Sequence, residues 1–189
     1  MDSSAPIEVR RVRVSDASVL RQVRLRALEL DPAAFAASLD ENRARPESHW
    51  KNRASESGSS DTKAEFLALD SDGTAVGLVG ALRIANHRDV AELVAMWIEP
   101  AFRGRGVAVG MIEAVLDWCT SVGVLEVELW VAPGNDGATR LYERCGFTQQ
   151  PPRKGAEQYD RFDTYLSLDL GEAAGNVASS ATNSPPPET

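Results

Sequence analysis

A glycine-rich turn between a predicted strand and a predicted helix is the first place in this chain that could bind a reactive ligand. Residues 103–108 read Arg-Gly-Arg-Gly-Val-Ala, between a β-like run that ends near Ile98 and a helical pattern that continues to Cys119. The first N–H groups of a helix lack intrahelical acceptors, and the helix dipole makes that end positive. Glycines also let a ligand approach the main chain. The turn is therefore suited to hold a phosphate or pyrophosphate.

Two further segments accompany this turn. Residues 135–147 read Asn-x-x-Ala-x-x-Leu-Tyr-x-x-x-Gly-Phe, at the spacing of the next strand and helix. Residues 92–100 read Glu-Leu-x-x-Met-x-Ile-x-Pro and lead directly into the turn. A glycine-rich turn alone often only ends a strand, so the three segments in this order are a more specific signal than any one of them.

In these three segments the chain resembles the GNAT superfamily of acetyl-CoA-dependent N-acetyltransferases, most strongly over residues 90–148. The resemblance implies an α/β (α+β) fold, with a mixed, mostly antiparallel central sheet flanked by helices and splayed between the fourth and fifth strands. It also implies acetyl-CoA as the acyl-donor cosubstrate. The implied acceptor is a primary amine of a small molecule, peptide or protein, which attacks the thioester directly in a ternary complex.

The resemblance assigns residues to acetyl-CoA. Backbone N–H groups of the turn would hold the pyrophosphate, and the pantetheine would pair like an added strand with main chain near Trp97 and Ile98. Arg103 matches the Arg or Gln that begins the family's turn, and Asn135 matches a residue that helps to order the pantetheine, although it could equally be only an N-cap. The predicted acetyl-CoA-binding residues are Trp97, Ile98, Arg103, Gly104, Arg105, Gly106, Val107, Ala108 and Asn135.

Two residues match the family's catalytic positions. Tyr142 matches the tyrosine that acts as an acid toward the departing thiolate, a role that suits a phenol of pKa about 10. Its alternative role is aromatic packing. Glu92 matches the glutamate that accepts the amine proton, usually through water.

The assignment of Glu92 depends on the geometry of its strand. Strict alternation puts it on one face with Val94, Met96 and Ile98, so a functional Glu92 requires a strand end or a bulge. A solvated carboxylate at a strand start is the alternative. Glu99, Asp160 or a water chain could serve as the base instead.

The amine acceptor is less defined. By resemblance, its site is built from the first two helices, their connecting loop and a late hairpin. Aromatic residues and a histidine in these segments are ordinary core residues as well as candidates. They are Phe35, His49, Trp50, Tyr159 and Phe162.

Composition indicates one globular domain. The chain has 189 residues, of which 43% are hydrophobic and 25% charged. We place the domain at residues 1–170 and expect residues 171–189, which lack leucine and aromatic residues, to form a disordered tail. The net charge of −8 argues against nucleic-acid binding. Without a signal-peptide pattern or an apolar run of about 18 residues, we predict a cytoplasmic protein without a membrane partner.

Other chemistries are disfavoured by the residue inventory. The chain has only two cysteines, Cys119 and Cys145, which are too few for a disulfide framework. It has two histidines, and no Cys or His pair has the spacing of metal ligands, so we expect no metal site. Both cysteines are expected to be packed free thiols. A Ser-His-Asp hydrolase is equally hard to assemble. The sequence leaves open whether the protein is a monomer or a homodimer.

Two rival functions remain. One rival is a dinucleotide-dependent oxidoreductase. Its glycine fingerprint is similar to Gly104-x-Gly106-x-x-x-Gly110, and an acidic residue, Glu126 or Glu128, follows about 20 residues later. Two features disfavour the oxidoreductase. Residues 100–102 lengthen the connection between the strand and the glycine turn, and the preceding strands follow an order typical of hairpins rather than of repeated βαβ units. A catalytically silent acyl-CoA-binding sensor or interaction module would keep the turn without the chemistry. The intact Tyr142 favours an enzyme.

Periodicity and turn residues place the elements around these motifs. We expect strands at 7–14, with a bulge, and at 64–69, 75–84, 90–98, 124–131 and 163–170. We expect helices from Ser15 or Asp16 to Asp31-Pro32, at 46–54, at 108–119 and from Asn135 or Asp136 to Gly146, with a loop at 55–62.

Overall fold

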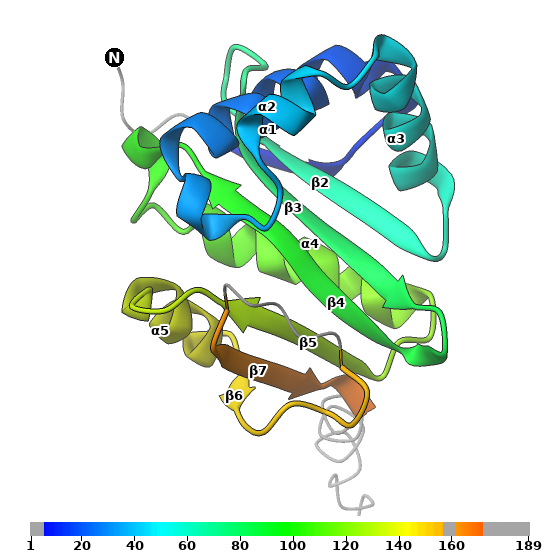
Figure 1. Cartoon of the computed structure of the whole chain (residues 1–189), viewed down its shortest axis with the longest axis vertical. Helices are drawn as coiled ribbons and strands as arrows, with labels where there is room; N and C mark the ends of the chain where they lie inside the picture. The colour runs from blue at the N-terminus through cyan, green and yellow to red at the C-terminus, as the bar shows by residue number, and fades with distance from the viewer. Residues whose placement is uncertain (1–5, 157–161, 172–189) are drawn as a thin grey trace, which may run out of the picture.

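One mixed sheet organises the part of the chain that the computed structural model describes, residues 6–156 and 162–171. Its strand order is β1-β2-β3-β4-β5-β7-β6, and of its neighbouring strands only β4 and β5 run parallel (Figure 1). The strands are β1 (Glu8–Arg11), β2 (Lys63–Leu69), β3 (Ala75–Ile84), β4 (His87–Ile98), β5 (Glu126–Val131), β6 (Thr148–Gln149) and β7 (Thr164–Asp169). The predicted mixed, mostly antiparallel sheet is confirmed.

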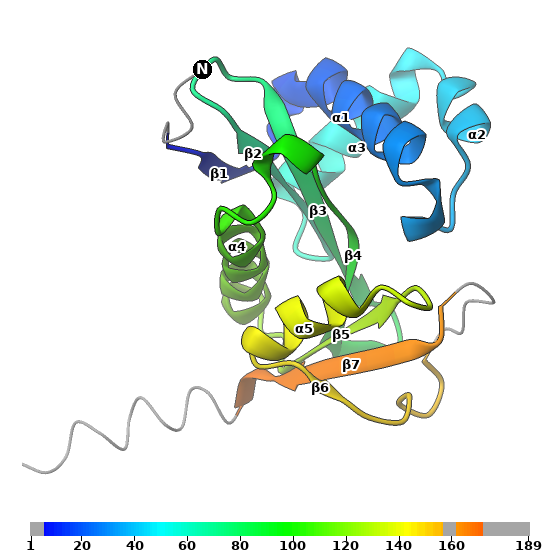
Figure 2. The ribbon, with the colours of Figure 1, turned by 90° about the vertical axis from the view of Figure 1, so that its left-hand side faces the viewer.

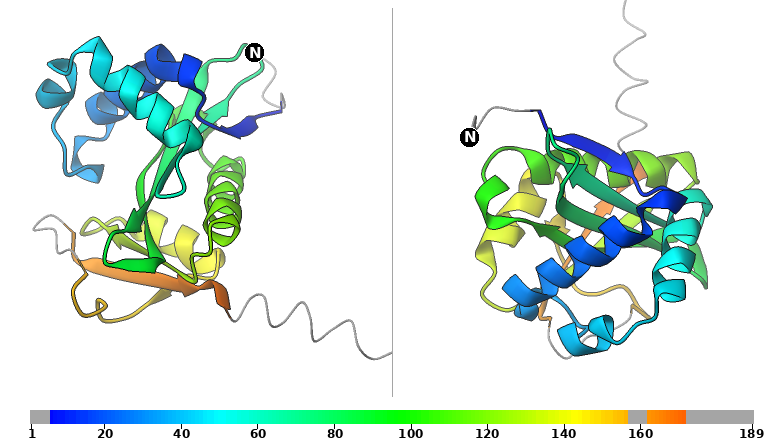
Figure 3. Two further views of the ribbon diagram at one scale, coloured as in Figure 1. Left: turned by 90° about the vertical axis from the view of Figure 1, so that its right-hand side faces the viewer. Right: turned by 90° about the horizontal axis from the view of Figure 1, so that it is seen from above.

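Helices cover both faces of this sheet. The N-terminal helices α1 (Ala17–Leu30), α2 (Leu39–Arg43) and α3 (Glu47–Ser59) lie over one face, and α4 (Val107–Ser121) lies against the other (Figures 2 and 3). The short helix α5 (Asp136–Arg144) lies beside β5 and shares the core of α4. The helix expected at 108–119 is confirmed, and its apolar stripe faces the core, since Met111, Ile112, Val115 and Cys119 are fully buried.

The sheet splays between β4 and β5. These strands pair over only three residue pairs, from Val90↔Glu126 to Glu92↔Glu128. Beyond this point β4 continues along β3, whereas β5 continues along β7, so the two strands diverge (Figure 1). A register shift between β3 and β4 accompanies the divergence, at Ala95, whose φ of 58° lies in the left-handed region. The splay that the family resemblance implies is therefore confirmed.

Several predicted boundaries are wrong. β1 ends at Arg11 with a regular register, without the bulge expected within 7–14, because the chain turns into a 3₁₀ helix at Val14–Asp16. The loop expected from residue 55 is helical through Ser59. Neither α2 nor β6 was predicted. The start of α2 is stabilised by a capping box between Ser38 and Glu41 rather than by a long apolar stripe.

The described elements all lie within the predicted domain, 1–170. The predicted tail, 171–189, falls outside the described residues except for Gly171, and Tyr159 and Asp160 also fall outside them. The domain boundary therefore stays a prediction. None of the helices within 6–156 and 162–171 is long and apolar enough to cross a membrane.

Candidate functional site

The glycine-rich turn lies at the N-terminus of α4. Gly104 and Gly106 have φ values of 75° and 79°, a conformation that favours glycine. A Cβ added to either glycine would meet no atom within 4 Å, so packing does not require glycine there and the space beside the backbone is open. No side chain caps the helix at Gly106. Its first N–H groups are therefore available to an anionic ligand, and pyrophosphate binding at the turn stays a prediction.

The residues around the turn attach it to the core and to α1. Val107 is buried and Ala108 half-buried, and the Arg105 guanidinium lies 5.1 Å from the centre of the Phe102 ring. These contacts fix the start of α4 while its N-terminal end stays open. The role of Arg105 in acetyl-CoA binding stays a prediction.

Arg103 and Trp97 both bind Asp31 at the end of α1. Asp31 Oδ2 accepts hydrogen bonds from Trp97 Nε1 at 2.7 Å and from Arg103 Nη2 at 2.6 Å. Arg103 Nε also donates to the Ile98 carbonyl at 2.9 Å. These bonds hold the end of β4 in place before the turn. The expected contact of Arg103 with phosphate stays a prediction.

The splay leaves open strand edges. Past the Glu92↔Glu128 pair, β4 and β5 have no ladder partner on the edges that face each other within the described residues. Trp97 and Ile98 lie in this part of β4. An extended ligand can add to such an edge by main-chain hydrogen bonds, which is what the pantetheine is expected to do.

A cavity of about 660 Å³ opens at the splay and brings the predicted catalytic residues into one wall. Glu92 from β4, Asn135 before α5 and Tyr142 from α5 all line it. From the splay, where it meets α5, the cavity extends to the N-terminal helices, because Arg24 of α1 and His49 of α3 also line it.

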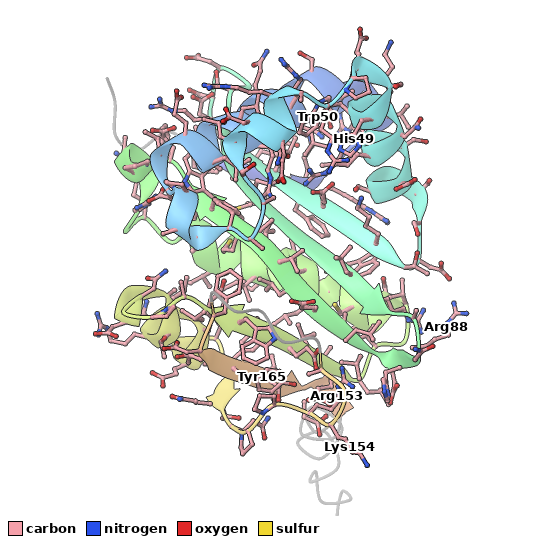
Figure 4. All side chains as sticks on the ribbon, in the orientation of Figure 1. His49, Trp50, Arg88, Arg153, Lys154 and Tyr165 are labelled. Carbon is pink, nitrogen blue, oxygen red and sulfur yellow. The ribbon has the colours of Figure 1, made fainter. Side chains whose placement is uncertain are left out.

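The predicted acceptor residues divide into two groups. Phe35, His49 and Phe162 line the cavity. Trp50, beside His49 on α3 in Figure 4, is instead a core residue that is 1% exposed. Trp50 therefore packs in the core behind the part of the cavity that His49 lines.

Glu92 faces the cavity because of the bulge in β4. In the register with β3, Glu92 lies opposite Leu82 and Trp97 opposite Leu78, which puts Glu92 and Trp97 on one face. Ile98 is on the other face, against α4, and the expectation that strict alternation joins it to Glu92 is wrong. The extra residue at the Ala95 bulge reverses the alternation beyond that point.

Tyr142 combines a packing contact with a place in the cavity wall. Its ring meets Phe147 edge to face, with centroids 5.7 Å apart, and the residue is 6% exposed. Burial raises the pKa of its phenol well above the ordinary range, so the hydroxyl stays protonated and can donate. Asn135 caps α5, since its Oδ1 accepts from the Ala138 N–H at 3.2 Å. Its expected contact with pantetheine stays a prediction.

Some charged residues that line the cavity were not anticipated from the sequence. Arg53 on α3 donates from Nε and Nη2 to the Glu65 carboxylate of β2, and Ser57 Oγ donates to the same carboxylate at 2.7 Å. Burial raises the pKa of Glu65, but the hydrogen bonds from Arg53 and Ser57 together with the charges of Arg53 and Lys63 lower it more, so its net pKa is lowered. Glu65 is therefore an ionised, fully partnered carboxylate.

Arg24 of α1 was also missed. The sequence carried a signal for it, because position 24 falls within an apolar stripe at helical spacing, formed by Leu20, Val23, Ala27 and Leu28. A charged residue inside a buried stripe is unusual and indicates a function or a buried partner.

Within the described residues, the cysteine thiols and the carboxylates form neither a metal site nor an activated nucleophile. No group of three or more His, Cys, Asp or Glu side chains there could hold a metal ion. Both cysteines are free. Burial raises the pKa of Cys119 to about 12 and also raises the pKa of Cys145.

Comparison with known proteins identifies the family to which this geometry belongs. A model of the Acetyltransferase (GNAT) family matches residues 25–147. An uncharacterized N-acetyltransferase from Methanocaldococcus jannaschii is 33% identical over 94 residues, which are 48% of this chain and 42% of that protein. The chain thus spans less than half of that relative. Spermidine N(1)-acetyltransferase from Vibrio cholerae is 30% identical over 141 residues, 68% of this chain and 80% of that protein.

Solved structures share the fold. PaiA N-acetyltransferase from Thermoplasma acidophilum, in complex with coenzyme A, is similar with a TM-score of 0.68 and 18% identity, over 87% of this chain and 99% of that chain. At this identity the similarity shows the fold alone. The family match covers well over half of the sequence, and the chain therefore belongs to the acetyltransferase (GNAT) family.

Proposed function

We propose that this protein is an acetyl-CoA-dependent N-acetyltransferase whose acceptor is a primary amine of a small molecule, peptide or protein. The observation that carries the proposal is that Glu92 and Tyr142 line one cavity where β4 and β5 splay apart. One side chain can accept a proton and the other can donate one.

Acetyl-CoA supplies the acetyl group as an activated thioester. The open glycine turn would hold its pyrophosphate through the N–H groups at the start of α4. The unpaired edge near Trp97 and Ile98 would hold the pantetheine, and a main-chain N–H of this edge would stabilise the charge that develops on the thioester oxygen. Arg103, Arg105 and Asn135 would complete the binding site.

Glu92 would act on the amine. An alkylamine has a pKa of about 10 and is mostly protonated at neutral pH, so it must lose a proton before it can attack. The Glu92 carboxylate would accept this proton through water. Tyr142, which burial keeps protonated, would donate its proton toward the departing thiolate.

Direct attack on the thioester is favoured over an acetyl-cysteine intermediate. A nucleophilic cysteine needs a lowered pKa or an adjacent base. Burial raises the pKa of both Cys119 and Cys145, and neither is among the described residues that line the cavity. A ternary complex of the two substrates is the simpler mechanism.

The rival functions have less support. A dinucleotide-dependent oxidoreductase would require repeated βαβ units, whereas β4 and β5 are the parallel pair in an otherwise antiparallel sheet within the described residues. A silent sensor would bind acetyl-CoA without turnover, which an assay can detect. The cytoplasmic location and the choice between monomer and homodimer stay predictions.

The test is thiol release from acetyl-CoA with a panel of amines, amino acids, peptides and aminoglycosides, for the wild type and Tyr142→Phe. We expect kcat of the variant to fall by about 10²- to 10⁴-fold, because the phenol proton is lost while the ring packing remains. Calorimetry should show near-normal acetyl-CoA affinity.

A matched control removes a hydroxyl outside the cavity. Tyr165 Oη donates to Glu128 Oε2 at 2.8 Å, beside Arg153 (Figure 4). Tyr165→Phe should lower stability and leave kcat nearly unchanged. Equal kcat for the wild type and Tyr142→Phe, with thiol release rate-limiting, would return Tyr142 to a packing role. Binding of acetyl-CoA with no turnover of any amine would favour the sensor.

A further inference from the structure

Arg24 is a buried cation without a full set of hydrogen-bond partners. The residue is 8% exposed, and its Nε and Nη1 atoms, both inaccessible to solvent, have no hydrogen-bond partner. Its guanidinium lies 4.6 Å from the centre of the Phe35 ring, which supplies a cation–π contact but no acceptor. Burying a charge without hydrogen bonds is costly, so this arrangement needs an explanation.

The other buried charges in the described residues are satisfied. Asp16 accepts hydrogen bonds from Arg10 and from the Arg13 N–H. Glu65 and Glu128 each bind an arginine and a hydroxyl group. Glu65 acts on Arg24 as a counter-charge, but its carboxylate accepts hydrogen bonds from Arg53 and Ser57, and Nε and Nη1 of Arg24 have no hydrogen-bond partner.

Arg24 stays charged in this setting. Burial lowers its pKa to about 10, with a further lowering by Arg53, so the guanidinium is still protonated at neutral pH. The surroundings carry more positive than negative charge, because Arg45, Arg53 and Lys63 lower the pKa of His49 after the effect of burial, whereas Glu56 alone raises it. This end of the cavity therefore favours a negative charge.

The position of Arg24 indicates the ligand. Arg24 lines the same cavity as Glu92 and Tyr142, so a molecule whose amine meets Glu92 can extend toward the guanidinium. The planar guanidinium fork matches a carboxylate or phosphate group and can bind it through two parallel hydrogen bonds. One oxyanion can accept from two adjacent N–H groups of this fork, Nη2 together with either Nε or Nη1, so a ligand would give a partner to one of the two nitrogens that lack one in the protein.

We propose that Arg24 binds an oxyanion of the acceptor, so that the substrate is an amine that also carries a carboxylate or a phosphate-like group, as amino acids and short peptides do. This inference rests on the proposed N-acetyltransferase function and narrows its acceptor. It disfavours purely cationic acceptors such as spermidine, the substrate named for the Vibrio cholerae relative, because they would bring positive charge to a positive end of the cavity.

The test compares matched amines in the thiol-release assay. The panel contains amino acids, their carboxamides, their decarboxylated amines, their aminophosphonate analogues and spermidine. We expect the wild type to prefer the acids over the carboxamides and decarboxylated amines by about ten- to hundredfold in kcat/KM, as expected for hydrogen bonds to a charged group. The ratio between carboxylates and phosphonates then identifies which oxyanion the site takes.

Variants of Arg24 locate this preference. Arg24→Met should lose the preference for acids, mainly through a higher KM, so that kcat/KM for an acid falls to about the value for its carboxamide. Arg24→Lys keeps the charge but lacks the fork and should be intermediate. Arg26→Gln is the matched control, because Arg26 is on the same helix but binds Glu99 instead of lining the cavity; it should retain the preference.

Stability and binding keep the proposal falsifiable. Because Arg24 lacks partners, Arg24→Met should leave the thermal midpoint unchanged or raise it, whereas a purely structural arginine would lower it on removal. Calorimetric titration of N-acetylated amino acids in the presence of CoA should show binding that Arg24→Met abolishes. Equal turnover of acids and carboxamides would overturn the proposal for Arg24 and leave the acetyltransferase function intact. Turnover of no amine, with anion binding that depends on Arg24, would instead contradict the proposed function.

Discussion

Glu92 occupies the last paired position before β4 leaves β5, and this position decides its role. It is half-buried and lines the cavity, whereas Glu99, seven residues on, binds Arg26 through both carboxylate oxygens. Both glutamates are candidates for the base from the sequence. Their surroundings favour Glu92, because a base must reach the amine inside the cavity.

We predict that Glu92→Gln lowers kcat/KM at pH 7 by about 10²- to 10⁴-fold, since the variant cannot accept the amine proton. The defect should shrink as the pH approaches the amine pKa of about 10, because free amine then forms without a base. A pH profile of thiol release from pH 6 to 10 measures both effects, and activity should appear at higher pH in the variant.

Glu99→Gln is the matched control for this prediction. It removes the same charge outside the cavity and should leave the pH profile where it is. A shift in Glu99→Gln but not in Glu92→Gln would assign the base to Glu99. Identical profiles for all three proteins would leave deprotonation to water.

Residue types, spacing and the family resemblance indicated single candidate side chains, but not the buried ion pairs. The resemblance found Tyr142 and Glu92, and the structure brings both into the cavity wall. By contrast, Glu128 reads as one of the polar alternating positions of a strand, yet it is 1% exposed and binds Arg153. Such a pair depends on tertiary contacts between distant segments, which local patterns do not contain.

At the scale of elements, the link between β4 and α4 carries the prediction for acetyl-CoA. Gly106 lies at the helix N-terminus with open space beside it. Gly106→Glu puts a side chain and a negative charge where the pyrophosphate is expected. We predict that acetyl-CoA binding, measured by calorimetry, is abolished.

A control for backbone strain is available at the other end of the same helix. Gly123 has a φ of 76° and also has no atom within 4 Å of an added Cβ. Gly123→Glu therefore has a similar conformational cost, about 1–2 kcal/mol for a left-handed non-glycine residue, without a charge at the turn. It should bind acetyl-CoA normally. If both variants lost acetyl-CoA affinity equally, backbone strain rather than the pyrophosphate site would explain the defect.

Periodicity predicted the elements that bury a long apolar face. The stripes of α1 and α4 and the apolar runs of β2 to β5 are recognisable because each element packs on the sheet. α2 has five residues and β6 two, too few for a periodic signal. The bulge at Ala95 was also beyond local reasoning, because it is the register with β3 that defines it.

At the scale of the whole molecule, the sheet separates two cores. One core joins the sheet to α4 and α5, and the other joins it to α1 and α3. The cavity is lined from both sides, by Tyr142 of α5 and by Arg24 and His49 of the N-terminal helices, so part of its wall depends on how these helices attach to the sheet. The buried group formed by Arg53, Ser57 and Glu65 makes this attachment, since it links α3 to β2.

This group makes the stability of the protein sensitive to acid. The folded-state pKa of Glu65 is lowered, so the unfolded chain binds its proton first as the pH falls. The contribution of Glu65 is therefore fully present above its unfolded pKa of about 4.3 and is lost as the pH drops through the lower folded value. Asp16, whose pKa is lowered by its hydrogen bond with Arg10, adds a loss in the same direction.

We predict that Glu65→Gln destabilises the protein by about 3–5 kcal/mol at pH 7, because it removes the buried partner of the half-buried Arg53 and leaves this cation without its carboxylate. Glu29→Gln, which breaks an exposed pair with Arg43, should cost no more than about 1 kcal/mol. Urea unfolding between pH 7 and pH 3 measures the free energy of unfolding of the wild type and of both variants. The difference between the wild type and Glu65→Gln should stay constant above about pH 5 and narrow below about pH 4, as the wild type loses the ionised carboxylate. A difference that does not change with pH would show that Glu65 stabilises the wall of the cavity by packing and hydrogen bonding rather than by its charge.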